Sequence, residues 1–138
     1  MVRIMNIEAT KNYFAGDRYA ALTGVEIVEA RTGYCKACLI IEDKHMNAAN
    51  VVQGGAIFTL ADLAFAVASN SRGQLALAIN VNISFLKAAS IGTLYAVATE
   101  VKEPGRIGAY DVLVTDDEGE IVARFNGMVY RKNIKIHE

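Results

Sequence analysis

The stretch that most limits the fold of this chain runs over residues 54–71, GGAIFTLADLAFAVASNS, and carries a single charge, on Asp62. It is rich in alanine and leucine, lacks the alternation of a strand and is too long for a typical one. We therefore predict a central helix over about residues 54–71, apolar almost all round and hence buried, that ends at Gly73. The run is shorter than the roughly 20 apolar residues of a membrane span, so we expect no membrane partner.

Bulk composition predicts one globular domain, residues 1–138, of a cytoplasmic protein. The 138 residues suffice for a single core and are too few for two ordinary domains. The formal net charge of −1, with no basic cluster beyond short pairs such as Arg131-Lys132, excludes a nucleic-acid-binding surface. Residues 1–20 contain no uninterrupted apolar stretch, so we expect no signal peptide.

The segments before the central helix predict a shorter helix and a β-hairpin. The helix is expected over about residues 7–21, with three aromatic anchors: Tyr13, Phe14 and Tyr19. Residues 24–31 and 34–41 alternate well enough to form two strands, and Thr32-Gly33 between them is a hairpin turn signal.

The segments after the central helix predict four strands in up-and-down order, joined by turns that contain Gly, Pro or Asp. They span residues 75–87, 91–102, 107–116 and 121–132. In the first of them, alternation places six apolar side chains on one face, namely Leu75, Leu77, Ile79, Val81, Ile83 and Phe85, and leaves Asn80, Asn82 and Ser84 on the other. The apolar face of the sheet needs a cover, which the central helix would supply.

The C-x-x-C motif at Cys35 and Cys38 lies in a β-patterned segment, whereas a redox motif would open a helix. A zinc site would need a second pair of ligands, and the only histidines are His45 and His137. At a strand period of two, the two cysteines point to opposite faces. We therefore predict two reduced structural cysteines and no metal site.

Gly54 and Gly55 open the central helix, where the first backbone N–H groups lack partners within the helix and the macrodipole adds about half a positive charge. Because they have no side chains, the two glycines would let a carbonyl oxygen or an oxyanion sit directly on these N–H groups. The alternative is that the pair only makes a tight turn into the helix.

Asp62 is a candidate catalytic group, because an ionised carboxylate in an apolar helix is costly unless it is paired, hydrogen-bonded or near water. Partial desolvation would raise the pKa of Asp62 toward neutrality, as a general base requires. The alternative is a structural aspartate satisfied by Thr59 or by a partner chain. About 10 Å of helix separates Asp62 from Gly55 of the same chain, but a twofold dimer with antiparallel helices would bring it beside the partner's glycines.

The residues from His45 to Asp62, HMNAANVVQGGAIFTLAD, combine these candidates in one spacing, with Asn47 followed by Gly54-Gly55 and then by Asp62. Together with ISFLKAA and DDEGEIVARFNGMVY further along, this pattern resembles the hotdog-fold acyl-CoA thioesterases of the phenylacetate-pathway (PaaI-like) type. The similarity covers roughly residues 22–131. It implies an α+β hotdog fold, with a six-stranded antiparallel sheet wrapped around the central helix, and assembly into a homodimer or homotetramer through a continuous sheet.

The resemblance also implies a role for each matching position. Gly54, with Gly55 beside it, would polarise the thioester carbonyl, and Asn47 would help to hold the carbonyl or the water. Asp62 of the partner subunit would act as general base or nucleophile. For Asn47 alone, the alternative is a loop asparagine that satisfies its own turn.

Three positions depart from the family pattern. Gln53 stands where the family has a histidine before the two glycines; glutamine can hydrogen-bond the substrate but cannot be protonated near neutral pH. Asn50 replaces a loop glycine and tolerates a left-handed backbone. The helper serine or threonine of some relatives falls on Ala78 here, so Asn80 or Asn82 would have to take that role.

Coenzyme A carries phosphates, so a nearly neutral protein needs local cations to bind it. The candidate CoA contacts are Ser84, Lys87, Lys102 and Arg106. The alternative for the three cations is that they are solvated charges in turns.

These observations predict a homo-oligomeric thioesterase that hydrolyses a fatty or aromatic acyl-CoA to the free acid and CoA, without a metal or redox cofactor. Water activated by Asp62 would attack the carbonyl directly, or would resolve an acyl-enzyme anhydride formed by Asp62. Two alternatives remain open. One is a non-catalytic acyl-CoA-binding or sensing protein, in which Gln53 marks lost chemistry. The other is a dehydratase of the same fold, which is less favoured because the central helix contains no histidine.

Overall fold

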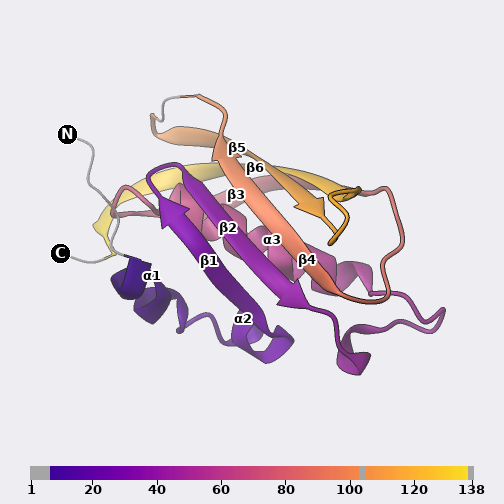
Figure 1. The fold of residues 1–138 in the computed structure, drawn as a ribbon. Helices are drawn as coiled ribbons and strands as arrows, with labels where there is room; N and C mark the ends of the chain where they lie inside the picture. The colour runs from indigo at the N-terminus through magenta and orange to yellow at the C-terminus, as the bar shows by residue number, and fades with distance from the viewer. Residues whose placement is uncertain (1–6, 103–104, 137–138) are drawn as a thin grey trace.

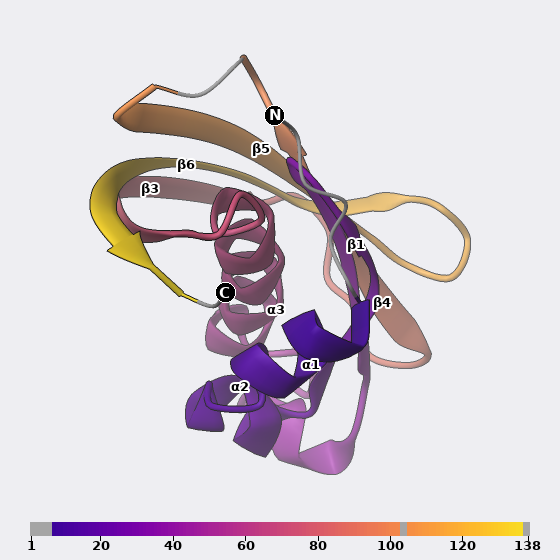
Figure 2. The ribbon, with the colours of Figure 1, turned by 90° about the vertical axis from the view of Figure 1, so that its left-hand side faces the viewer.

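Helix α3 (Gly54–Ser69) lies across one face of an antiparallel sheet that curves around it (Figure 1, Figure 2). The computed structural model describes residues 7–102 and 105–136. Helices α1 (Ile7–Phe14) and α2 (Arg18–Thr23) precede the sheet, and a short 3-10 helix, η1 (Asp43–His45), precedes α3. The strands are β1 (Val25–Arg31), β2 (Tyr34–Ile40), β3 (Gln74–Phe85), β4 (Thr93–Glu100), β5 (Ile107–Thr115) and β6 (Ile121–Lys135). The α+β architecture predicted from the sequence is thereby confirmed.

The six strands form a single sheet in the order β1-β2-β4-β5-β6-β3. The predicted up-and-down order is therefore wrong for β3, which pairs with β6 and not with β4. The connection from β3 to β4 crosses the end of the sheet, where Val122 accepts hydrogen bonds from Leu86 N–H at 2.8 Å and Lys87 N–H at 3.2 Å. Strand β6 pairs with β5 along one edge and with β3 along the other, so β3 becomes an edge strand.

The apolar alternation predicted for β3 fails at a bulge between Ala78 and Asn80, where the register with β6 shifts. Val81 and Ile83, beyond the bulge, still pack against the core. Leu77 and Ile79 are about half exposed while Ala76 is buried in the core, because the bulge shifts the inward-outward alternation of this part of the strand.

The single N-terminal helix expected over residues 7–21 is two helices, because the chain turns at Asp17 and begins a new helix. The Asp17 side chain accepts a hydrogen bond from Ala20 N–H at 3.0 Å and so caps α2. Of the three predicted aromatic anchors, only Phe14 packs against the core, whereas Tyr13 is 41% and Tyr19 69% exposed. The aromatic content of this segment thus overstated how much of it is buried.

The two cysteines are free thiols on opposite faces of β2, as the strand period predicts. Cys35 is buried beneath α3, and this burial raises the pKa of its thiol to about 12. Cys38 is partly exposed on the other face. Among residues 7–102 and 105–136, no three His, Cys, Asp or Glu side chains are grouped so that they could hold a metal ion. None of the helices in these ranges has the length and apolar character needed to cross a lipid bilayer.

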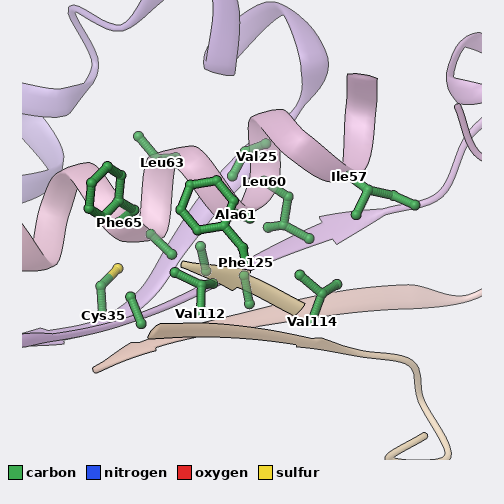
Figure 3. Close-up of a cluster of buried hydrophobic side chains, with 14 of the residues drawn as sticks. Val25, Cys35, Ile57, Leu60, Ala61, Leu63, Phe65, Val112, Val114 and Phe125 are labelled. Atoms are coloured by element: carbon green, nitrogen blue, oxygen red, sulfur yellow. The ribbon is translucent and has the colours of Figure 1, made fainter. Parts of the chain in front are cut away.

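The core fills the space between α3 and the inner face of the sheet (Figure 3). Phe65 of α3 is 2% exposed and packs against Phe125 and Tyr110, with ring centroids 5.4 and 5.9 Å apart. Gly127 of β6 makes this packing possible, since a Cβ there would lie 2.6 Å from the Phe65 ring. The glycine therefore sets how closely the helix approaches the sheet.

We expect Gly127→Ala to lower the free energy of unfolding by about 1–3 kcal/mol, because the added methyl group overpacks a site where Phe65 has no room to move. The measurement is chemical denaturation. Gly105→Ala is the matched control, because a Cβ at Gly105 meets open space and should change stability by less than about 0.5 kcal/mol. Equal effects of the two substitutions would contradict this account of the helix–sheet contact.

Candidate active site

One face of α3 is not covered by the sheet, contrary to the prediction of a helix buried all round. Along this face lie Gly55, Thr59, Asp62 and Ala66, all at least partly exposed. Their spacing of four, three and four residues puts them on one side of the helix. We call this row the open stripe of α3. Helix α2 packs beside it, so the stripe and α2 together form one surface (Figure 2).

The backbone at the start of α3 has unused hydrogen-bond donors. Gln53 precedes the helix in an extended conformation, and its carbonyl accepts from Ala56 N–H at 2.9 Å and Ile57 N–H at 3.3 Å. The amide hydrogens of Gly54 and Gly55 have no acceptor among the residues that the structure describes. Because the positive end of the helix dipole lies here too, the two amides can bind a carbonyl oxygen or an oxyanion.

Close contacts explain why glycine occupies both positions. A Cβ on Gly54 would lie 3.0 Å from the ring of Phe85, and one on Gly55 would lie 2.7 Å from Oε1 of Gln53. Neither residue has a positive φ, so the turn itself does not demand glycine. The two glycines are therefore explained by groups that lie close to the helix start more than by a tight turn of the backbone.

Asp62 lies in the middle of the open stripe as a carboxylate without a partner. No hydrogen bond or ion pair to it occurs within residues 7–102 and 105–136. The Thr59 hydroxyl, which could have satisfied it, donates instead to the Gly55 carbonyl at 2.8 Å. Burial, and to a smaller extent the charge of Asp17, raise the pKa of Asp62 above its ordinary value. The alternative of a structural aspartate satisfied by Thr59 is therefore not supported within the described part of this chain.

Within one chain, Asp62 and the glycine amides do not meet. They lie about 10 Å apart along α3 at 1.5 Å per residue. Bringing them together requires a second copy of the chain, as the sequence predicts, and the pairing of two helices stays a prediction.

Asn47 lies in an exposed loop and orders it. Its side-chain oxygen accepts hydrogen bonds from Ala49 N–H at 2.9 Å and Val51 N–H at 3.2 Å. The alternative that Asn47 satisfies its own loop therefore holds for the oxygen half of the side-chain amide. Its Nδ2 group has no partner among the described residues. Asn50, in the same loop, has a φ of 61°, the left-handed conformation expected where relatives carry glycine.

His45, considered from the sequence only as a zinc ligand, fixes the loop to α2. It is buried, its Nδ1 accepts from Glu42 N–H at 2.9 Å, and its Nε2 lies 2.6 Å from the Thr23 carbonyl. Its own carbonyl accepts from Gln53 N–H at 2.8 Å. This side chain therefore connects the end of α2 to the residue that begins the candidate site.

The four predicted CoA contacts lie in different places. Ser84 is exposed on the sheet face turned away from α3. Lys87 binds Asp116 at 2.7 Å and also Glu120, and these carboxylates raise the pKa of its ammonium group above its usual range. Lys102 is exposed at the end of the described segment. Only Arg106 lines a basic pocket.

That pocket, of about 430 Å³, lies where β5 begins and β6 ends, and we call it the basic pocket. Its cations are Arg72, Arg106, Arg131 and Lys132. Arg131 is buried, donates to the Gly105 carbonyl at 3.0 Å and lies 3.9 Å from the Glu100 carboxylate, which also pairs with Arg72 at 2.9 Å. Within the described residues, Glu100 thus pairs with two of the four cations. Sequence reasoning missed this cluster because its members are far apart in the chain, and only the Arg131-Lys132 pair was visible.

Comparison with known proteins agrees with this geometry. The family model described as "Thioesterase superfamily" matches residues 49–123. A protein of Archaeoglobus fulgidus named "Putative esterase" is 43% identical over 129 residues, which cover 92% of this chain and 84% of that protein. The "Acyl-coenzyme A thioesterase PaaI" of Escherichia coli is 29% identical over 119 residues, covering 86% and 85% of the two chains.

Comparison with solved structures points to the same family. The structure of the E. coli PaaI protein superposes with a TM-score of 0.83 at 28% identity, covering 94% of this chain and 99% of that one. A Streptococcus mutans protein, solved bound to acetyl-CoA, has a TM-score of 0.77 at 26% identity and covers 81% and 91% of the two chains. With its helix start, open stripe and curved sheet, the chain belongs to the thioesterase superfamily, as a PaaI-like thioester hydrolase with the hotdog fold.

Proposed function

We propose that this protein hydrolyses acyl-CoA thioesters to a free fatty or aromatic acid and CoA. The observation that carries the proposal is the pair of unused amide hydrogens at Gly54 and Gly55, on the same helix as the unpaired carboxylate of Asp62. The acetyl-CoA bound to the S. mutans protein supports the substrate class.

In the proposed reaction, the thioester carbonyl oxygen accepts hydrogen bonds from the helix-start amides. These donors stabilise the negative charge that develops on the oxygen, and such a donor typically contributes a factor of about 100–1,000 in rate. The Gln53 carboxamide, folded close over Gly55, is an additional neutral donor at this position. It takes the place of the family histidine without supplying a proton.

Asp62 provides the base. In one route it removes a proton from water as the water oxygen bonds to the carbonyl carbon; the C–S bond then breaks and the leaving thiolate recovers the proton. In the other, the carboxylate itself attacks the carbonyl carbon, and the C–S bond breaks to release the CoA thiolate. Water then hydrolyses the resulting anhydride to the free acid and the Asp62 carboxyl group, which loses its proton to the thiolate. The raised pKa suits a base near neutral pH in either route. Asn47, whose Nδ2 group is not used by its loop, would orient the water or the carbonyl.

The site requires a dimer, because Asp62 serves the glycine amides of the other subunit in this proposal. Two features support association. The open stripe of α3 exposes Asp62 together with Thr59 and Ala66, and the edge strand β3 exposes the apolar side chains of Leu77 and Ile79. An unpaired strand edge with apolar side chains is a ready surface for a second copy. A homodimer, or a homotetramer built from two dimers, would complete two or four sites.

The basic pocket is the proposed site for the CoA phosphates. Its arginines suit phosphate recognition, and no ion pair to Arg106 or Lys132 occurs among the residues that the structure describes. The pocket begins at Arg72, just beyond the end of α3, about 10 Å of helix past Asp62. Of the predicted contacts, this favours Arg106, which lines the pocket, over Lys87, which Asp116 and Glu120 neutralise, and over Ser84 and Lys102, which do not line it.

The proposed reaction uses water and protein groups, so it needs neither a metal nor a redox cofactor. We also propose a cytoplasmic location, where Cys35 and Cys38 would remain the free thiols that the structure contains.

The direct test is release of free thiol from a panel of acyl-CoA esters. We expect turnover by the wild type and a loss of about 100-fold or more in kcat for Asp62→Asn, because an amide cannot accept the proton. Asp43→Asn, on the exposed η1, is the matched control and should retain full activity. Tight acyl-CoA binding without thiol release would favour the sensing protein, and hydration of an enoyl-CoA the dehydratase; either result would refute hydrolysis.

A second test examines the amide hydrogens at the helix start separately from the Asp62 carboxylate. Gly54→Pro removes one amide hydrogen at the first helical position, where proline is tolerated, and Gln53 before it already has the ψ of 140° that proline favours. We expect a loss of about 100-fold in kcat from this change. Gly54→Ala keeps the amide hydrogen but adds a side chain against the half-exposed Phe85, so the difference in kcat between the two variants measures the lost donor, and Gly54→Ala should lose less than Gly54→Pro.

Co-expressing Gly54→Pro subunits with Asp62→Asn subunits should restore about a quarter of wild-type activity, because half of the dimers are mixed and each has one intact site. Activity no greater than that of the two variants alone would show that Asp62 and Gly54 do not act across an interface.

The raised pKa of Asp62 also predicts how stability changes with pH. Because its folded-state pKa lies above that of the unfolded chain, the ionised carboxylate destabilises the fold above its own pKa, and the penalty disappears below the unfolded pKa. Asp62→Asn should therefore raise Tm at neutral pH, and the gain should vanish at about pH 4. Thermal unfolding across this range, with Asp43→Asn as control, measures it. A gain that persists in acid would contradict the assigned cause.

A further inference from the structure

A groove of about 360 Å³ lies between α2 and the beginning of α3. Tyr19 and Leu22 of α2 form one wall, Gly55 and Thr59 of α3 form the other, and Met46 and Gln53 close the end near the loop. We call it the α2 groove. It begins at Gly55, one of the two residues whose amide hydrogens have no acceptor.

Tyr19 and Leu22 are 69% and 72% exposed, which is unusual for large apolar side chains on a short, well-anchored helix. Helix α2 is fixed at both ends. Asp17 caps its beginning, and at its end Gly24, with a φ of 97°, donates to the Ala20 and Ala21 carbonyls. The wall of the groove is therefore rigid, and its apolar side chains are held at the surface beside the candidate site.

Two further contacts hold this wall against the loop that precedes α3. Nζ of Lys44 donates to the Leu22 carbonyl at 3.2 Å, and the buried His45 ring meets the Thr23 carbonyl. Both contacts use backbone carbonyls and leave the Leu22 side chain free to line the groove. Polar contacts to the α2 backbone therefore hold this helix in the position that exposes its apolar side chains.

The chemistry of the proposed reaction indicates which part of the substrate would bind to this surface. Once the thioester oxygen rests on the amides of Gly54 and Gly55, the carbonyl carbon carries two further groups that must leave in different directions. The sulfur and its CoA arm lead toward the cations of the basic pocket. The acyl group needs apolar contacts that start near Gly55. The α2 groove offers the apolar side chains of Tyr19, Leu22, Met46 and Ala56 there, alongside the polar side chains of Thr23, Lys44, His45, Gln53 and Thr59.

We propose that the α2 groove binds the acyl group and that Tyr19 and Leu22 determine acyl specificity; this inference rests on the proposed thioesterase function. The groove is at the small end of the range for ligand sites. Contacts with its walls grow with the size of the acyl group until the groove is full. Acetyl, next to the amides, barely touches Tyr19 and Leu22, whereas hexanoyl or benzoyl packs between them.

The test compares kcat/KM for acetyl-, hexanoyl- and benzoyl-CoA. Leu22→Trp fills the groove and Tyr19→Ala removes a wall. Each should lower kcat/KM for hexanoyl- and benzoyl-CoA about tenfold or more while acetyl-CoA changes less than about threefold, a discrimination typical of apolar pockets. Ile91→Trp, at an 85% exposed position on the loop before β4, is the matched control and should leave all three values unchanged.

Calorimetric binding of the non-hydrolysable thioethers S-hexyl-CoA and S-methyl-CoA gives an independent readout. We expect Leu22→Trp to weaken S-hexyl-CoA about tenfold and to leave S-methyl-CoA unchanged. If the wild type releases no thiol from any ester, the proposed hydrolysis fails, and thioether binding still decides whether the groove takes the acyl chain. Equal effects on long and short ligands would overturn the inference. So would dissociation of the oligomer by these variants, which would show that Tyr19 and Leu22 pack against a second copy.

Discussion

The close packing of α3 on the curved sheet is the contact on which the rest of the structure depends. The tip of the Phe65 ring can lie against β6 only because Gly127 presents no side chain. This contact fixes which side of α3 is buried, and it leaves the opposite side, with Asp62, to the surface. The same helix therefore contributes the centre of the core and the open stripe that carries the candidate catalytic carboxylate. Its position decides where the unused amides of Gly54 and Gly55 point.

Three surface regions correspond to three parts of the proposed substrate, and each would use a different kind of interaction. In the proposals made above, backbone amides at the helix start would bind the reacting carbonyl, charged side chains of the basic pocket would bind the phosphates, and the α2 groove would receive the acyl group. These elements come from separate parts of the chain: Gln53 and Gly54 at the start of α3, Arg131 near the end of β6, and Leu22 in α2. Specificity can therefore change in α2 without disturbing the groups that carry out the reaction.

Sequence reasoning located unusual structural features where one residue contradicted its surroundings. Asp62 was singled out because a charge within an apolar helix demands an explanation, and the glycine pair because of its position at a helix start. The structure places the glycines at the start of α3 and leaves Asp62 partly exposed, and the catalytic roles of these residues stay predictions. It failed where neighbours far apart in the chain decide the outcome. Strand β3 pairs with β6, the last strand of the chain, the exposure of Ile79 depends on a bulge, and Arg72 meets Arg131 only after folding. The break before α2 was visible in principle, because Gly16-Asp17 combines a flexible residue with a good helix cap.

The contact between Phe85 and Gly54 links two regions with different tasks. Phe85 ends the edge strand, and its ring rests on the first residue of α3. The ligand proposed at the helix start and the second copy proposed at the strand edge would therefore both lie near the same aromatic ring. An isotopic label placed on Phe85 would report on both regions through a single side chain.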